Sequence, residues 1–248
     1  MSDTAKVVLI SGGNTGIGAA TAELLASQGW RVIISGRNAD SAKRVTDSIT
    51  AKGGQVRFLQ ADIGRENEVI RLHKDALDIW GRLDAAVNNA GISTDSAMFH
   101  ELDTKHFRDM LEVNVLGLFW SMKEQLKHFS KSGKGHIVNL SSIAGMHGVP
   151  FTGSYSATKH AVSGMTRSAA LDYAKTDIRI NAVAPGAIQT DILSDALRRG
   201  VYTYESIADM FPTKKLGVAL DIAQAISFLL NSNYATGSFV SVDGGYGI

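Results

Sequence analysis

Short, almost continuously apolar runs alternate along the chain with longer stretches in which apolar residues recur at helical spacing. A continuous apolar run is typical of a parallel strand covered on both faces, whereas the longer stretches predict amphipathic helices. The predicted strands are Lys6–Ile10, Arg31–Ser35, Gln55–Gln60, Leu83–Asn88, His136–Leu140, Arg179–Ala184 and Phe239–Val242. The predicted helices are Gly16–Gln28, Asp40–Lys52, Glu66–Trp80, Thr104–Ser130, Ser154–Lys175 and Leu220–Asn231. This alternation predicts one doubly wound α/β domain over residues 1–248, with a seven-stranded parallel sheet.

One segment, residues 188–216, departs from this alternation. It carries polar and aromatic residues, among them Tyr202, Tyr204 and Phe211, between the sixth strand and the last helix. Long connections in a compact domain often have a function, so we expect a lid over a substrate site. Two short surface helices without a catalytic role are the alternative.

Composition narrows the class of protein. With 44% hydrophobic and 20% charged residues, the 248-residue chain is typical of a globular domain. The net charge of +1 argues against a nucleic acid or an anionic membrane as partner. The absence of cysteine excludes disulfides, thiolate catalysis and zinc–thiolate sites. We expect no protein-bound catalytic metal, because no cluster of the H-E-x-x-H type is present. We also expect a cytoplasmic location, because no signal-peptide pattern and no long apolar run is present.

A glycine-rich turn follows the first predicted strand and opens the first predicted helix. Its glycines, Gly12, Gly16 and Gly18, are spaced differently from the general G-x-G-x-x-G fingerprint. Glycine permits a tight turn and a close approach of the backbone to a pyrophosphate, and the helix N-terminus attracts that anion. The turn therefore predicts nucleotide binding, although a plain strand-to-helix turn is the alternative.

The end of the second predicted strand indicates which nucleotide binds. NAD sites usually have Asp or Glu there to hold the ribose 2′-hydroxyl, but this chain has Gly36 and Arg37. A guanidinium pairs well with a 2′-phosphate. We therefore predict NADP(H), with NAD(H) as the less favoured cofactor; a merely solvated Arg37 is the alternative.

Tyr155 and Lys159 lie four residues apart and share one face of a predicted helix. A nearby ammonium favours the phenolate and lowers the pKa of a phenol, so this pair suits proton transfer to or from a carbonyl oxygen. Ser142 follows a strand at the sheet edge where such folds bind ligands. Taken singly, the pair is also typical of a helix surface and the serine of a helix cap.

These elements together resemble the short-chain dehydrogenase/reductase family, over nearly the whole chain. The matching motifs are Gly12-x-x-x-Gly16-Ile17-Gly18, Asn88-Asn89-Ala90-Gly91, Asn114, Ser142, Tyr155-x-x-x-Lys159, Pro185-Gly186-x-x-x-Thr190 and Val242-Asp243-Gly244-Gly245. The resemblance implies a Rossmann-type fold and reversible carbonyl reduction or alcohol oxidation. It also implies a homotetramer in which the long helices Thr104–Ser130 and Ser154–Lys175 pair with symmetry mates. Thr15 is a departure, because many NADP(H)-dependent members have a basic residue there.

The resemblance assigns roles to individual residues. The implied catalytic set comprises Tyr155 as acid/base, Ser142 orienting the carbonyl, Lys159 binding the ribose and Asn114 supporting a water relay. The implied cofactor residues are Gly12, Asn14, Thr15, Gly16, Ile17, Gly18, Arg37, Asp62, Ile63, Asn88, Ala90, Gly91, Tyr155, Lys159, Pro185, Gly186, Ile188 and Thr190. The alternative for Asn114 is a residue that satisfies backbone groups, and for Thr190 one that begins a helix.

The predicted substrate pocket combines Ser93, Ser142, Met146, His147 and Phe151 with the 188–216 segment. Its apolar character is compatible with a 3-oxoacyl thioester, a simple ketone, a sugar or a steroid. Two other classes of function remain open. One is a non-catalytic nucleotide-binding regulatory protein on the same scaffold, which the intact Ser142, Tyr155 and Lys159 disfavour. The other is a methyltransferase, which has no use for the tyrosine–lysine pair.

Overall fold

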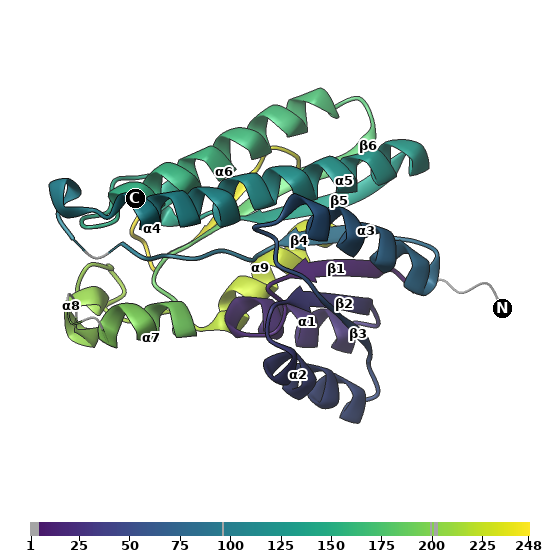
Figure 1. The fold of residues 1–248 in the computed structure, drawn as a ribbon, viewed down its shortest axis with the longest axis horizontal. Helices are drawn as coiled ribbons and strands as arrows, with labels where there is room; N and C mark the ends of the chain where they lie inside the picture. Colours follow the sequence, from purple (N-terminus) through teal and green to yellow (C-terminus); the bar gives the residue numbers. More distant parts are fainter. Residues whose placement is uncertain (1–4, 96, 199, 201–202) are drawn as a thin grey trace.

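A seven-stranded parallel sheet forms the centre of the molecule (Figure 1), as predicted, within the residues that the computed structural model describes: 5–95, 97–198, 200 and 203–248. Its order is β3-β2-β1-β4-β5-β6-β7, so the strand order reverses between β1 and β4. The strands are β1 (Val7–Ser11), β2 (Arg31–Gly36), β3 (Gln55–Gln60), β4 (Ala85–Asn88), β5 (Lys134–Leu140), β6 (Asp177–Pro185) and β7 (Phe239–Val242). Ligands bind at the carboxyl ends of the strands beside such a reversal.

Helices cover both faces of the sheet (Figure 1). The helices are α1 (Gly16–Ser27), α2 (Ala39–Ala51), α3 (Glu66–Trp80), α4 (Thr104–Met110), α5 (Gly117–Ser132), α6 (Gly153–Asp172), α7 (Asp191–Arg198), α8 (Tyr204–Ala208) and α9 (Ala219–Asn231). Three short helical segments, η1 (Phe99–Glu101), η2 (Leu111–Leu116) and η3 (Ile143–Gly145), complete the set. In β1, Val8 and Ile10 pack in the core with α1, α2 and α9, whereas Val7 and Leu9 pack in the core with α3, α5 and α6. Burial on both faces explains why β1 is apolar at successive positions.

The predicted helix Thr104–Ser130 is not one continuous α-helix. Between α4 and α5 the chain forms one stretch of π-helix, η2, which contains Asn114. Gly117 then begins α5 so close to the loop between β3 and α3 that a Cβ there would lie 2.6 Å from the carbonyl oxygen of Ile63. π-helical turns occur frequently at functional sites, and the apolar spacing did not indicate this one.

Residues 188–216 carry two short helices, α7 and α8, after a bridge between Ile188 and Gly217. Phe211 is buried in a small apolar cluster with Ile143 and Ile207, so the segment packs against the rest of the domain. Tyr202 lies outside the described residues. In the described part of the chain, none of the helices has both the length and the apolar character needed to cross a membrane.

Candidate active site

The glycine-rich turn between β1 and α1 has no room for a Cβ at Gly12, Gly13 or Gly18. Gly12 and Gly16 have φ angles of +64° and +51°, which favour glycine. A Cβ on Gly18 would lie 2.1 Å from the carbonyl oxygen of Gly12, so α1 packs directly on the turn. The side-chain amide of Asn89 stabilises the turn by donating to the carbonyl oxygens of Ser11 (3.1 Å) and Gly12 (3.0 Å). The result is a cradle of backbone at the N-terminus of a helix, where anions bind.

A cavity of about 270 Å³ opens over this turn. The predicted cofactor residues that line it are Gly12, Asn14, Thr15, Gly16, Ile17, Arg37, Asp62, Ile63, Ala90, Gly91 and Thr190. The strands β1, β2, β3 and β4 thus deliver residues to one edge of the sheet, although those residues are far apart in sequence. We call this space the nucleotide cavity.

Two predicted cofactor residues, Gly18 and Asn88, line neither the nucleotide cavity nor the second cavity that adjoins it. Gly18 lies behind the turn, where its role is to let α1 pack closely. Asn88 is buried and exchanges two amide hydrogen bonds with Gln125, at 3.0 and 2.8 Å, and donates a third to Asn139. Its neighbour Asn89, which the prediction did not assign to the cofactor, lines the cavity instead. Side chains of successive residues at a strand end point to opposite sides, so the sequence already indicated that Asn88 and Asn89 would not both face the cavity.

A second cavity of about 250 Å³ adjoins the first, because both are lined by Ile17, Asn89, Gly91, Ile92 and Thr190. The predicted residues Ser93, Ser142, Tyr155, Lys159, Pro185, Gly186 and Ile188 also line it. Further lining residues, not assigned individually beforehand, are Asp95, Ile143, Val149, Thr152, Leu193, Ile207, Met210 and Phe211. Four of these come from the 188–216 segment. We call this space the substrate cavity.

Three residues predicted for the substrate pocket are absent from its lining, and the prediction is corrected for them. The sulfur of Met146 accepts a contact from Arg167, and the ring of His147 lies 6.3 Å from that of Tyr246. Phe151 adopts a left-handed backbone, with φ of 61°, and is 39% exposed. The same loop reaches the substrate cavity through Val149 and Thr152. Proximity to Ser142 in sequence therefore did not place these three side chains.

Tyr155 and Lys159 lie in the first turns of α6, with the Nζ atom of Lys159 5.6 Å from the centre of the Tyr155 ring. Lys159 is buried and donates to the carbonyl oxygen of Leu140 at 2.7 Å. Ser142 lies two residues beyond the end of β5, caps η3 and accepts from the backbone N–H of Ala144 at 3.1 Å. The structure thus brings together a serine from the segment after β5 and two residues of α6.

Burial dominates the protonation of this pair. It raises the pKa of Tyr155 to about 12, against a smaller opposing effect of the hydrogen bond with Ser142. Burial also lowers the pKa of Lys159 to about 8. The expectation that the ammonium lowers the phenol's pKa does not hold in this structure, since desolvation disfavours the charged form of each group. The phenol is therefore protonated at neutral pH.

Asp95 positions the start of α6 and was missed at the sequence level. Its Oδ2 accepts a hydrogen bond from the backbone N–H of Tyr155 at 2.7 Å, across 60 residues of sequence. Asp95 is buried, with 7% of the residue exposed, and borders the substrate cavity. An anion at a helix N-terminus satisfies a free N–H and interacts favourably with the helix dipole. No local sequence pattern indicates a cap supplied from so far away.

Asn114 joins the π-helical segment η2 to two other elements. Its Oδ1 accepts from the N–H of Ile92 (2.8 Å), and its Nδ2 donates to the carbonyl oxygen of Ile92 (2.8 Å) and to Thr158 (3.1 Å). Asn114 therefore satisfies the backbone groups of Ile92, as the alternative explanation of this residue predicted. A small cavity of about 10 Å³, lined by both Asn114 and Lys159, lies beside it, close to the space that one water needs.

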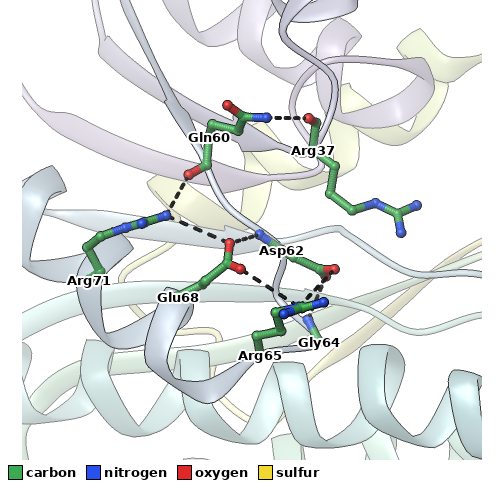
Figure 2. A network of polar contacts seen from close by, with 7 residues as sticks. All are labelled: Arg37, Gln60, Asp62, Gly64, Arg65, Glu68 and Arg71. Atoms are coloured by element: carbon green, nitrogen blue, oxygen red, sulfur yellow. Dashed lines mark hydrogen bonds and ion pairs between the residues drawn. The ribbon is translucent and has the colours of Figure 1, made fainter.

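Charges around the nucleotide cavity differ in how they are used (Figure 2). Arg65 and Arg71 both contact the Glu68 carboxylate, at 3.8 and 3.7 Å, and Arg65 also lies 4.0 Å from Asp62. Arg37 is exposed, and only its backbone carbonyl is engaged, by Gln60 at 2.9 Å. Among the described acidic residues, none forms an ion pair with Arg37. Its guanidinium thus remains available to an anion at the cavity wall.

The part of the chain that the structure describes holds no cluster of three potential metal ligands.

Fold and site together define a dinucleotide-binding oxidoreductase scaffold. A model of the family described as short chain dehydrogenase matches residues 6–199, and the chain belongs to this family. It is 37% identical over 250 residues to the 2,5-dichloro-2,5-cyclohexadiene-1,4-diol dehydrogenase of Sphingobium indicum, covering 99% of both chains. It is 35% identical to the 3-oxoacyl-[acyl-carrier-protein] reductase of Synechocystis, covering 98% of this chain and 97% of the relative. The structure of ElxO with NADP bound superposes with a TM-score of 0.92 at 40% identity, covering 98% of this chain and 99% of the other.

Proposed function

We propose that this protein is an NADP(H)-dependent enzyme that interconverts an uncharged ketone or aldehyde and its alcohol. The observation that carries the proposal is the grouping of Ser142, Tyr155 and Lys159 on one wall of a cavity that adjoins a glycine-lined nucleotide cavity. The solved neighbour with NADP bound supports the choice of nucleotide.

The nucleotide cavity fits a dinucleotide phosphate. The backbone of Gly12 and Gly16 at the N-terminus of α1 suits the pyrophosphate, and the uncommitted guanidinium of Arg37 suits a 2′-phosphate. Asp62 and Ile63 would border the adenine, and Ala90 and Gly91 the adenosine ribose. Pro185, Gly186, Ile188 and Thr190 line the substrate cavity, with Thr190 shared, and would hold the nicotinamide end. When bound, NADPH supplies the hydride.

Tyr155 is the general acid for carbonyl reduction in this proposal. Its pKa of about 12 keeps the phenol protonated at neutral pH, ready to donate to the developing alkoxide. Ser142 hydrogen-bonds the same substrate oxygen and orients it, while Lys159 binds the nicotinamide ribose. Asn114 would support a relay through one water in the small cavity beside Lys159, and that relay would return a proton to the tyrosine. In the oxidising direction Tyr155 is the base, which requires a positive charge near the phenolate to lower its pKa.

The substrate is compact and uncharged. The walls of the substrate cavity include Ile143, Val149, Leu193, Met210 and Phe211. The charged side chains among its described lining residues are Asp95 and Lys159, and each already has a protein partner. An anionic substrate would meet no free cation there, so a cyclic or short aliphatic ketone fits best. A 3-oxoacyl thioester is the second candidate, favoured by the Synechocystis relative.

Two structural features belong to the same proposal. The α7–α8 segment closes one side of the substrate cavity through Leu193, Ile207 and Met210, and we assign it the role of a lid. The face formed by α5 and α6 carries an open groove lined by apolar side chains such as Phe119, which is 49% exposed, and we assign it to a homotetramer contact. Light scattering tests the tetramer, and a monomer at working concentration would contradict it.

The first experiment is a titration with NADPH and with NADH, followed by nicotinamide fluorescence. We expect clear preference for NADPH. Turnover is then measured with cyclohexanone, with the anion 4-oxocyclohexanecarboxylate and with an acetoacetyl thioester of N-acetylcysteamine. Cyclohexanone should be reduced with the highest kcat/KM.

Each other outcome points to a different class. Faster reduction of the thioester favours the second candidate. Tight NADPH binding without turnover on any carbonyl supports the non-catalytic regulatory protein. Binding of S-adenosylmethionine but of neither nicotinamide nucleotide supports the methyltransferase.

A further inference from the structure

The end of β2 and the glycine-rich turn meet where the side chain of Asn14 covers Gly36. A Cβ on Gly36 would lie 2.2 Å from the Oδ1 of Asn14, 2.8 Å from its Cγ and 3.3 Å from its Nδ2. The planar amide therefore lies against the α-carbon of Gly36. No side chain fits at position 36 while Asn14 keeps this place. Both residues line the nucleotide cavity.

A chain of hydrogen bonds holds Asn14 there. Its Nδ2 donates to the Oγ of Ser41 at 2.6 Å. Ser41 is buried; its hydroxyl donates to the carbonyl oxygen of Asn38 (3.1 Å), and its N–H donates to the Asn38 side chain (3.0 Å). Because the hydroxyl hydrogen of Ser41 is committed to Asn38, its oxygen can only accept from Asn14. This fixes the amide of Asn14 with Nδ2 toward Ser41 and Oδ1 toward Gly36.

We propose that Asn14, clamped by Ser41, is a specificity-determining residue that closes position 36 to a carboxylate by shape. The inference rests on the proposed NADP(H) function and deepens it. An acidic residue at the end of the second strand is what holds the ribose 2′-hydroxyl in NAD sites, and it would repel a 2′-phosphate. Preference for NADP(H) then has two separate sources: the charge of Arg37 and the space that Asn14 occupies.

The two sources make different predictions for substitutions at position 36. Gly36→Asp alone should lower NADPH affinity at least about tenfold without improving NADH binding, because the new Cβ displaces Asn14 from Ser41. Asn14→Ala removes all three atoms that crowd Gly36. In the double variant Asn14→Ala/Gly36→Asp, the carboxylate has room to reach the ribose, and NADH affinity should exceed that of Gly36→Asp by about tenfold.

Gly36→Ala separates shape from charge. It adds the crowding Cβ but no carboxylate, so it should weaken NADPH and NADH binding by similar factors. Asn14→Ala/Gly36→Ala should recover NADPH affinity to within about threefold of Asn14→Ala, within the effect of a single hydrogen bond. Gly164→Asp on α6 is the matched control, because an added Cβ there meets no atom within 4 Å and lies outside both cavities. Its nucleotide affinities should equal those of the wild type.

The experiment measures dissociation constants of NADPH and NADH by nicotinamide fluorescence for the wild type and all six variants, with thermal unfolding of each to confirm folding. An equal gain in NADH affinity in Gly36→Asp and in Asn14→Ala/Gly36→Asp would overturn the role of Asn14. So would failure of Asn14→Ala to rescue Gly36→Ala, a comparison that remains available if Gly36→Asp does not fold. Wild-type protein that binds neither nucleotide would instead refute the proposed function itself.

Discussion

Removing the Asp95 carboxylate should loosen the start of α6 and lower both stability and turnover. The carboxylate accepts from the Tyr155 N–H at 2.7 Å, and Asp95 is 7% exposed. A hydrogen bond to a charged group contributes about 1.5–3 kcal/mol, and its loss here leaves a partly buried N–H without its partner. For a chain of this length, about 1 kcal/mol shifts Tm by about 2–4 °C. Asp95→Ala should therefore lower Tm by about 3–12 °C.

Two further variants separate the hydrogen bond from other effects of the substitution. Asp95→Asn keeps a carbonyl acceptor and loses the charge, which at a helix N-terminus contributes about 0.3–1 kcal/mol, so its Tm should fall by only about 1–4 °C. Asp103→Ala is the matched control, because Asp103 also accepts from a helix N-terminal N–H, that of His106 at 2.9 Å, but at an exposed position. It should lower Tm less than Asp95→Ala does.

The assay is thermal unfolding by circular dichroism at fixed protein concentration, together with kcat on the best carbonyl substrate. Asp95→Ala should lower kcat because Tyr155 loses its backbone anchor, whereas Asp103→Ala should leave kcat unchanged. The reasoning fails if Asp95→Ala melts within about 1 °C of the wild type, since a bond of the expected strength would then be absent. It also fails if the control variant loses as much turnover as Asp95→Ala.

Three other substitutions test the site. Tyr155→Phe should abolish turnover while NADPH binding persists, since it removes only the proton donor; near-normal kcat would refute the mechanism. Arg37→Asp should shift preference from NADPH toward NADH, and an unchanged ratio of dissociation constants would remove Arg37 from the phosphate site. Because burial lowers the pKa of Lys159 from the ordinary lysine value of 10.5 to about 8, the folded protein binds fewer protons than the unfolded chain between these two pH values. Denaturant unfolding should show wild-type stability rising relative to Lys159→Met across this interval, and a pH-independent difference would contradict the shift.

Local patterns were sufficient to predict the fold. Each β1 position is buried, against one helical layer or the other, and that two-sided burial appears in the sequence as an unbroken apolar run. The glycine spacing, with Gly12 and Gly16 at positive φ, and the i,i+4 pair Tyr155 and Lys159 are likewise local, because one turn and one helix contain them. Patterns of this kind depend on neighbours along the chain, so the sequence alone displays them.

Other features depended on contacts between distant segments. Asn114, in the π-helical turn, hydrogen-bonds the backbone of Ile92, and Asp95 reaches Tyr155 across 60 residues. Asn89 rather than Asn88 faces the nucleotide cavity because of how β4 ends beside the glycine turn. Met146, His147 and Phe151 follow Ser142 closely in sequence, yet they are not among the residues that line the substrate cavity.

The protonation of the catalytic pair shows the same division. Sequence spacing placed Tyr155 beside Lys159 and suggested that charge would set the phenol's pKa. Burial is the largest cause of the pKa shift of each group in the folded protein, and desolvation depends on every atom packed around the site. The sequence by itself therefore determined the order of strands and helices and the identity of the reactive groups. Only the tertiary structure decided which side chains face the two cavities and how strongly each is desolvated, because both depend on packing between segments distant in the chain.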